Sequence, residues 1–266
     1  MAGFATVRLW AKTHMEKSVR MTPSPRFSLI VPARNEADYL PRLFDTIDLA
    51  RNNYRLGPEA VEMIVADNVS TDRTAEIARK RGARVVPVEK RLIAAVRNGG
   101  ACAARGEVLA FLDADSQMHP DTFNAIDQCL DTGRVVGGAT GVCMERMSLG
   151  IAMTYALFMP FVWMTRMDTG VVFCLRGDFV AVGGYNEELS FAEDVRFLMD
   201  LRRLGRWRGQ RLIRVRAAKA IASTRKFDQF GDWHYLTGFL RGLYWLAFAP
   251  KAGRAFAQKY WYGDMR

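Results

Sequence analysis

Four short apolar runs recur through the first half of the chain, and a segment with helical spacing follows each of them. The runs are residues 27–31, 61–66, 84–88 and 107–112. Their length and apolar content are typical of strands buried in a sheet. Strands that alternate with helices in this way predict a mostly parallel central sheet flanked by helices, which is an α/β fold.

The second half of the chain departs from this alternation. Strand-like runs at residues 135–144, 171–175 and 212–215 are mixed with helix-like segments at 151–165 and 193–204. This pattern predicts a less regular α+β elaboration of the same sheet. With 266 residues, half of them hydrophobic, the chain is long enough for one large domain.

The net charge is +10, and a basic protein attracts nucleic acid, anionic membrane surfaces or phosphorylated small molecules. Because the chain lacks helix-turn-helix, zinc-finger and RNA-binding signatures, we expect no nucleic acid partner. Its four cysteines are scattered without the spacing of a zinc site, and its charged N-terminus lacks the apolar core of a signal peptide. These features indicate a cytoplasmic protein, with the inner face of the membrane as an alternative location.

Two apolar segments, residues 151–165 and 236–250, are candidates for membrane contact. The first contains Pro160 and is followed by Arg166, and the second is interrupted by Arg241. Both are short for a membrane span, which needs about 20 apolar residues. Each is either a buried core helix, which we favour, or a surface that rests on a membrane.

Polar clusters directly follow three of the four predicted strands of the first half. They are residues 32–36, 67–72 and 113–115. The carboxyl ends of parallel strands meet along one edge of a sheet, and this edge forms the ligand crevice of open α/β sheets. We therefore expect the three clusters to build one site.

The cluster Asp113-Ala114-Asp115 carries the clearest chemistry. Two carboxylates at i and i+2, leaving an apolar strand, supply the hard oxygen ligands that Mg²⁺ or Mn²⁺ prefers. Such a metal can bridge a diphosphate and neutralise the charge of a departing group. A solvated turn or a helix cap is the usual explanation of an isolated Asp-x-Asp, but the position after a strand favours the metal.

Other polar residues are candidates for binding or catalysis, and for each of them an ordinary structural role is the alternative. Asp67 can accept a hydrogen bond from a nucleobase or form a turn. Arg34 and Arg97 can contact phosphate or remain surface cations. Glu193 and Asp194 open a predicted helix, whose N-terminus keeps carboxylates ionised as a general base requires. Helix capping is the alternative for these two.

Taken together, these motifs resemble the inverting glycosyltransferases of family 2, over about residues 27–204. The matching motifs are residues 28–36, 65–68 with Asp72, 97–99 through 106–107, 111–115, 183–185 and 193–194. The resemblance implies a GT-A fold, which is Rossmann-like, and a UDP- or GDP-linked nucleoside-diphosphate sugar as donor. We expect a poorly ordered N-terminal arm (1–26), a catalytic domain (27–225) and a C-terminal helical tail (226–266). Within the domain, residues 27–132 form the nucleotide-binding half and residues 133–225 the acceptor-side half.

The resemblance also implies roles for individual residues. The nucleotide pocket is lined by Pro32, Arg34 and Glu36, and the base is met by Asp67. Asp115 is the main metal ligand, and Asp113 lies nearer the ribose or the water shell of the metal. Asp194 deprotonates the acceptor hydroxyl, with Glu193 as the next candidate. We also place Ala33, Arg97 and Ala114 in the nucleotide-sugar site.

The C-terminal segment is a possible source of a further metal ligand. GT-A enzymes often recruit such a ligand there, and in some families it is a histidine. His234 is the candidate in this chain. A surface or partly buried histidine without a ligand role is the alternative.

The chain also departs from the family pattern. Val69 stands where a glycine is usual, and the Gln-x-x-Arg-Trp motif of processive synthases is absent. One rival interpretation is a nucleotidyltransferase acting on a sugar phosphate, although residues 32–36 contain no glycine. Another is a catalytically inactive nucleotide-sugar-binding module, although both Asp113-Asp115 and Asp194 are retained.

The acceptor stays open at this point. The basic stretch at residues 202–226 can attract anionic lipid headgroups or a lipid-linked phosphate. A lipid-linked acceptor with peripheral membrane contact is therefore one alternative, and a small soluble acceptor is the other.

Overall fold

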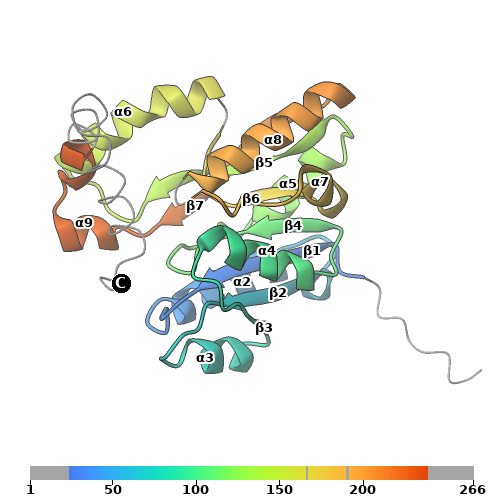
Figure 1. Cartoon of the computed structure of the whole chain (residues 1–266), viewed down its shortest axis with the longest axis horizontal. Coiled ribbons are helices and arrows are strands. Elements are labelled where there is room, and N and C mark those ends of the chain that lie inside the picture. Colours follow the sequence, from blue (N-terminus) through green and yellow to red (C-terminus); the bar gives the residue numbers. More distant parts are fainter. Residues whose placement is uncertain (1–23, 166, 190–191, 239–266) are drawn as a thin grey trace, which may run out of the picture.

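The computed structural model describes residues 24–165, 167–189 and 192–238. Within these ranges, seven strands form one sheet in the order β3-β2-β1-β4-β6-β5-β7 (Figure 1). The strands are β1 Phe27–Ala33, β2 Val61–Asp67, β3 Arg84–Pro87, β4 Val108–Phe111, β5 Val135–Met144, β6 Val172–Leu175 and β7 Arg211–Ala222. The four predicted runs of the first half form adjacent parallel strands, so the predicted parallel sheet is confirmed.

The second half extends the same sheet and introduces one reversed strand. β6 runs antiparallel to both β4 and β5, whereas β5 and β7 are parallel. β7 is longer than the predicted run 212–215, because it pairs with β5 along most of that strand. On this edge strand, Arg216 and Lys219 are exposed, whereas the neighbouring Ala218 and Ala220 are buried. Charged residues are common on edge strands, and they make such a strand difficult to predict from apolar content.

Helices cover both faces of the sheet (Figure 1). They are α2 Leu40–Asn52, α3 Thr74–Lys80, α4 Ile93–Ala103, α5 Thr122–Leu130, α6 Leu149–Thr165, α7 Arg176–Val182, α8 Glu193–Arg208 and α9 Arg225–Phe230, with a 3-10 turn η1 at Pro58–Ala60. Side chains of α2, α3 and α5 pack in one core cluster, and side chains of α4, α7 and α8 pack in another. Leu29 and Val31 of β1 belong to the first cluster and Ile30 to the second. This alternation is expected for a strand that is buried on both faces.

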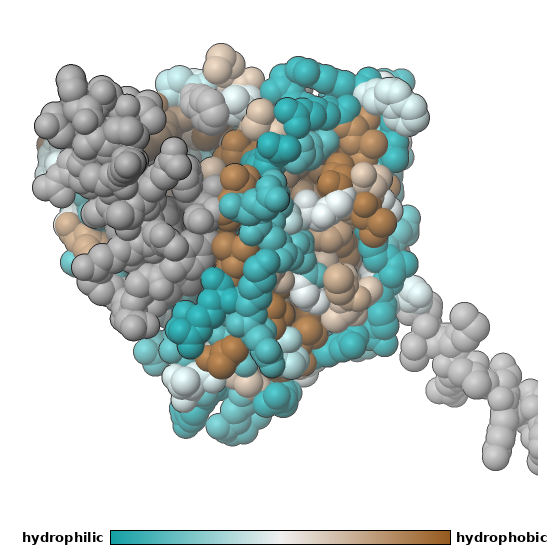
Figure 2. Space-filling model, in the orientation of Figure 1, coloured by the Kyte–Doolittle hydropathy of each residue, from teal (hydrophilic) through white to brown (hydrophobic). Residues whose placement is uncertain are grey.

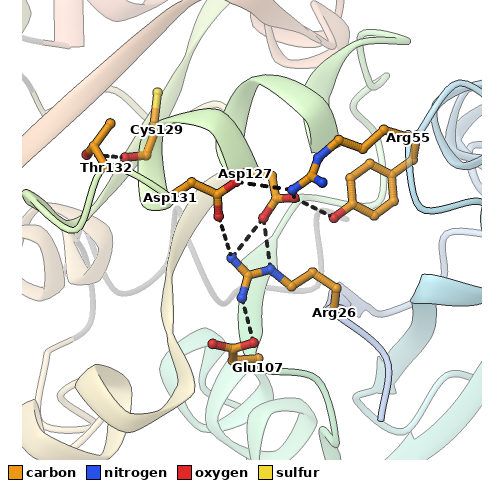
Figure 3. Close-up of polar contacts among 8 residues, drawn as sticks. Arg26, Arg55, Glu107, Asp127, Cys129, Asp131 and Thr132 are labelled. Carbon is orange, nitrogen blue, oxygen red and sulfur yellow. Dashed lines mark hydrogen bonds and ion pairs between the residues drawn. The ribbon is translucent and has the colours of Figure 1, made fainter. Parts of the chain in front are cut away.

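A buried carboxylate ties α5 to the amino ends of β1 and β4. Asp127 is fully buried and accepts hydrogen bonds from Arg26 Nε at 2.8 Å, from the Tyr54 hydroxyl at 2.8 Å and from the Arg55 guanidinium (Figure 3). Arg26 also pairs with Glu107 at 2.5 Å. Arg26 and Glu107 directly precede their strands. The cluster therefore lies at the opposite end of these strands from the predicted site.

We expect the substitution Asp127→Ala to lower the free energy of unfolding by about 1.5–3 kcal/mol, because it leaves the buried Tyr54 hydroxyl without its acceptor and removes charged hydrogen bonds to Arg26 and Arg55. Urea denaturation measures this loss. Asp131→Ala is the matched control, since Asp131 pairs with the same two arginines but its side chain is 54% exposed. An exposed pair contributes at most about 1 kcal/mol. Equal losses in the two variants would contradict the stabilising role that we give to the buried carboxylate.

The apolar helix α6 is anchored on one side and open on the other. Ile151 is buried, and the Tyr155 hydroxyl donates to the Val142 carbonyl of β5 at 2.8 Å, whereas Leu149 and Met153 are exposed. Segment 151–165 is therefore a half-exposed helix rather than the buried core helix that we favoured. In the part of the chain that the structure describes, helices long and apolar enough to cross a bilayer are absent.

The molecular surface mixes both kinds of residue. Figure 2 shows hydrophobic residues exposed between hydrophilic ones on the face in view. Residues 1–23 and 239–266, which include most of the predicted arm and tail and most of segment 236–250, lie outside the described residues.

Candidate active site

The loops after β1 and β2 are joined by hydrogen bonds. The Glu36 backbone N–H donates to the Thr74 hydroxyl at 2.8 Å, and the Thr71 N–H donates to Asn35 Oδ1 at 2.8 Å. Val69, at the position where a glycine is usual, has a φ of 56°. Glycine adopts this left-handed conformation without steric cost, whereas a β-branched residue such as valine rarely adopts it. Clusters 32–36 and 67–72 therefore lie together, as predicted.

A cavity of about 660 Å³ opens where the carboxyl ends of β1, β2 and β4 meet the amino end of α8. Its lining includes most of the predicted site residues: Pro32, Ala33, Arg34, Glu36, Arg97, Asp113, Ala114, Asp115, Glu193 and Asp194. Cavities of this size are typical of small-molecule and cofactor sites. Residues from both halves of the chain thus converge on one site.

Arg97 links the acidic residues of β4 and α8. Its Nη2 donates to Asp113 Oδ1 at 2.9 Å, and its Nη1 lies 2.7 Å from Glu193 Oε1 and 3.2 Å from Asp194 Oδ1. The side chain is 6% exposed, and its guanidinium carbon lies 5.3 Å from the centre of the Tyr185 ring. Arg97 therefore holds three carboxylates with one positive charge. The phosphate contact that we expected for it stays a prediction.

Asp194 lies in the first turn of α8, whose N-cap residue Ala192 cannot cap with its side chain. Burial raises the pKa of the Asp194 carboxyl from 3.8 to about 6; the charge of Arg97 opposes this rise, and Glu193 and Asp113 add to it. A carboxyl group with a pKa closer to neutral pH is a better proton acceptor than an ordinary aspartate. The helix N-terminus was expected to keep this carboxylate ionised, whereas burial disfavours its ionised form. The role of Asp194 as the general base stays a prediction.

Asp115 contacts a residue from the far end of the sheet. Arg225, the first residue of α9, places Nε 3.0 Å from Asp115 Oδ2 and makes two hydrogen bonds to Glu36, at 2.8 and 3.0 Å. Its guanidinium carbon lies 4.9 Å from the centre of the Tyr39 ring. Burial raises the pKa of Asp115, and the charge of Arg225 opposes the rise.

The carboxylate pair after β4 fits a divalent metal shared with a ligand. Asp115 is 21% exposed and already binds a cationic side chain, so this position stabilises positive charge. Among the residues described, no group of three or more His, Cys, Asp or Glu side chains is arranged to hold a metal. A magnesium or manganese ion at Asp113 and Asp115 would therefore take its other ligands from phosphate oxygens and water, as Mg²⁺ does in nucleotide sites.

Asp67 lies at the end of β2 but outside the lining of the cavity. Its Oδ1 accepts the N–H of Ser70 at 3.3 Å, which is the turn-forming contact of the alternative interpretation. The neighbouring Asn68 lines the cavity instead and donates to the carbonyls of Val88 and Lys90. The contact of Asp67 with a base stays a prediction.

His234 also lies outside the lining of this cavity. Its ring stacks on Phe230, with 4.8 Å between the ring centres. Within the described ranges, the structure does not bring His234 into a metal-holding group with Asp113 and Asp115. The geometry therefore gives no support to the predicted ligand role of His234.

Arg225 and Lys226 line the cavity, although the sequence had suggested only a lipid-facing role for them. The predicted strand 212–215 ends about ten residues before Arg225, whereas β7 ends at Ala222. If the predicted strand had extended to Ala222, the polar residues after it would have been recognised as a further cluster at the carboxyl end of a strand. The missed signal was therefore the length of β7.

The comparisons with known proteins agree with the motifs. The family model described as glycosyl transferase family 2 matches residues 28–167. A 4,4'-diaponeurosporenoate glycosyltransferase of Staphylococcus haemolyticus is 38% identical over an alignment of 104 residues, and the match covers 35% of this chain and 24% of that protein. The aligned part thus spans about a quarter of this curated relative.

Solved structures are similar over a larger part of the chain. The mannosyltransferase PcManGT from Pyrobaculum calidifontis, in complex with GDP-Man and Mn²⁺, has a TM-score of 0.58 and 20% identity, covering 81% of this chain and 63% of that chain. S. aureus TarS 1–349, in complex with UDP, has a TM-score of 0.57 and 18% identity, covering 78% and 63%. At these identities the likeness establishes the fold, and it confirms the predicted GT-A fold.

Proposed function

This chain belongs to glycosyl transferase family 2 and is a glycosyltransferase, and we propose that it is a metal-dependent, inverting enzyme that uses a nucleoside-diphosphate sugar. One observation carries the proposal. The carboxylate pair Asp113 and Asp115 and the carboxylate of Asp194 open into one cavity, in which Arg97 connects Asp113 to Asp194. An inverting transfer needs charge neutralisation at the leaving diphosphate and a base at the acceptor, and this site offers residues for both.

We assign the donor to the ends of β1, β2 and β4. The residues assigned to the nucleotide sugar are Pro32, Ala33, Arg34, Glu36, Asp67, Arg97, Asp113 and Ala114. A magnesium or manganese ion held by Asp115 and Asp113 would supply positive charge to the leaving diphosphate. The complexes of TarS with UDP and of PcManGT with GDP-Man and Mn²⁺ support a UDP- or GDP-linked donor and a divalent metal.

We assign the acceptor to the side of Asp194. In its ionised form, the Asp194 carboxylate takes the proton of the acceptor hydroxyl while that oxygen forms a bond to the anomeric carbon. The bond from this carbon to the diphosphate oxygen breaks, and the diphosphate leaves with the electron pair. Attack from the face opposite the diphosphate inverts the anomeric configuration. Glu193 shares Arg97 with Asp194 and is the alternative base.

Thermal stabilisation by a panel of nucleotides tests the donor assignment. We expect a UDP- or GDP-linked sugar to raise the melting temperature more with Mn²⁺ than without it. At a ligand concentration of 100 times Kd the stabilisation is about 2.7 kcal/mol. A nucleotidyltransferase would instead respond to a nucleoside triphosphate and a sugar phosphate. Absence of any metal-dependent response to UDP, GDP and their sugars would contradict the proposed function.

The pH dependence of turnover tests the base. Because the pKa of Asp194 is raised to about 6 and the base acts only when ionised, kcat should be half-maximal near pH 6 and level off near pH 7. An ordinary aspartate would give half-maximal kcat near pH 4 and a plateau from about pH 5 upward. The measurement is kcat from pH 4.5 to 8 at saturating donor and Mn²⁺. A flat profile between pH 5 and 7 would assign the base to another group.

We also propose that the acceptor-side half contacts an anionic lipid surface. Trp163 and Met164 at the end of α6 are 64% and 76% exposed. They line two shallow hollows together with Arg202, Arg206, Arg211 and Arg216. We call these six residues the lipid-facing surface. Exposed tryptophan beside several arginines is typical of helices that lie in the membrane interface, where each basic charge contributes about 1 kcal/mol.

Co-sedimentation with vesicles tests this surface. We expect binding to vesicles that contain phosphatidylglycerol and little binding to pure phosphatidylcholine. Arg206→Ser should weaken binding about fivefold, as expected for the loss of about 1 kcal/mol. Arg79→Ser is the matched control, because Arg79 is an exposed arginine on α3, beside the opposite edge of the sheet. If the parent protein does not bind anionic vesicles at low salt, the lipid-facing surface is wrong and a small soluble acceptor is the remaining alternative.

A further inference from the structure

Arg225 reaches the donor site from a distant part of the chain. It begins α9, after the edge strand β7, whereas its partners Glu36 and Asp115 follow the central strands β1 and β4. Its contact with Glu36 joins residues 189 positions apart. The side chain is 27% exposed and lines the cavity. A cation is thus built into the site beside the carboxylate that we assign to the metal.

The contacts of Arg225 are of two kinds. Glu36, which is 8% exposed, receives hydrogen bonds from Nη1 and Nη2, and the guanidinium also lies over the Tyr39 ring. Such a paired contact fixes the plane of a guanidinium. Asp115 forms an ion pair with Arg225, with 3.0 Å between Nε and Oδ2. Arg225 can therefore release Asp115 by giving up this ion pair, while both hydrogen bonds to Glu36 remain.

A metal on Asp115 competes with that ion pair. A magnesium or manganese ion lies about 2.1 Å from its carboxylate ligands. On Asp115 Oδ2 such an ion would stand next to the guanidinium, and the two positive charges would repel each other. Metal and Arg225 therefore exclude each other at this oxygen.

We propose that Arg225 is a stand-in counter-ion for the metal. In the donor-free protein it neutralises Asp115. When metal and donor bind, it releases Asp115, stays anchored on Glu36 and pairs with the diphosphate. This inference rests on the proposed function, because it assumes a metal at Asp115.

The exchange couples metal binding to nucleotide binding. Without a nucleotide, the metal must displace Arg225, which then lacks a second anionic partner. With a nucleotide, the diphosphate supplies that partner through charge-assisted hydrogen bonds. The metal should therefore bind weakly alone and more tightly with UDP or GDP, and by linkage the nucleotide should gain the same factor from the metal.

Direct titration of Mn²⁺, followed by the electron paramagnetic resonance signal of the free ion, tests the exchange without an activity assay. Without nucleotide, we expect Arg225→Gln to bind Mn²⁺ roughly fivefold more tightly than the parent, since the competing ion pair is lost. With saturating UDP or GDP, we expect this gain to disappear, because the diphosphate has lost its arginine partner. The factor by which nucleotide strengthens Mn²⁺ binding should thus be smaller in the variant.

Two further variants make the test specific. Lys226→Gln removes the same charge from the next residue, which lines the same cavity, and it should change the nucleotide-free Mn²⁺ affinity less than Arg225→Gln does. Arg225→Lys keeps the charge, but one ammonium group cannot reproduce the paired contact with Glu36. Arg225→Lys should therefore also bind Mn²⁺ more tightly than the parent without nucleotide, but by a smaller factor than Arg225→Gln. It replaces Arg225→Gln in the test if that variant does not fold.

The outcomes separate this inference from the proposed function. Unchanged or weaker Mn²⁺ binding in Arg225→Gln, with normal nucleotide-dependent Mn²⁺ binding in the parent, would overturn the inference alone. Equal changes of Mn²⁺ affinity in Arg225→Gln and Lys226→Gln would also overturn it. The effect would then come from the net charge of the cavity and not from the contact between Arg225 and Asp115. If the parent binds no Mn²⁺ even with UDP or GDP, the metal assignment fails and the inference fails with it.

Discussion

Replacing Asp194 by Asn is expected to lower turnover by about 10²- to 10⁴-fold, which is the usual contribution of a positioned general base. Asn keeps the size of the side chain and can still lie beside Arg97, but it cannot take a proton from the acceptor. Donor affinity should change little, because the donor is assigned to the ends of β1, β2 and β4. The measurements are kcat with saturating donor and acceptor, and donor Kd from thermal stabilisation.

Glu193→Gln is the matched control for this prediction. Glu193 is the neighbouring carboxylate, it contacts the same guanidinium nitrogen and it is equally shielded from solvent, with 12% exposure against 18% for Asp194. We expect its replacement to reduce turnover much less than Asp194→Asn does. The reverse order of the two effects would assign the base to Glu193.

Stability separates loss of the base from loss of the fold. The pKa of Asp194 in the folded protein is raised from 3.8 to about 6, so folding disfavours its ionised form. This destabilisation is absent below about pH 4, grows as pH rises and is complete above about pH 6. Asp194→Asn removes the charge, so the variant should melt at a higher temperature than the parent at pH 8, with a smaller difference at pH 4. A lower melting temperature at pH 8 would indicate that Arg97 needs this third carboxylate.

The first half of the fold was predictable because its signals are local. The runs that became β1, β2 and β4 are mostly apolar, and each ends in a polar cluster within a few residues. The parallel alignment of these strands then places Asp113 and Asp115 next to residues 32–36. The same reasoning identified the run 171–175 that became β6 but not its reversed direction, since a short apolar run carries no information about direction.

Contacts between distant residues limited the prediction of the site. The sequence presents Arg97 as a surface cation or a phosphate ligand, yet the side chain is 6% exposed and faces three carboxylates. Its role depends on side-chain contacts between α4, the residue Asp113 after β4 and the first turn of α8, which no local pattern shows. Arg225 was missed as a site residue because the predicted strand 212–215 ends before β7 does, and because its partner Glu36 lies 189 positions away. The acidic residues could be predicted from residue type and strand position. The arginines that pair with them could be identified only from the packing of the folded chain.

The substitution Asp115→Ala is expected to abolish metal-dependent donor binding and to leave the fold intact. Loss of a residue that only supports a metal ligand lowers metal affinity about 10- to 100-fold, and loss of a ligand itself should exceed this. The fold should persist, because Asp115 follows β4 at the edge of the sheet and Arg225 keeps its two hydrogen bonds to Glu36. The measurements are Mn²⁺ titration with UDP and GDP, and the melting temperature without ligands.

Asp113→Ala is the control. It should weaken Mn²⁺ and donor binding less than Asp115→Ala does, because the Asp113 side chain is 54% exposed and already paired with Arg97. Unchanged Mn²⁺ and donor binding in Asp115→Ala would falsify the metal assignment.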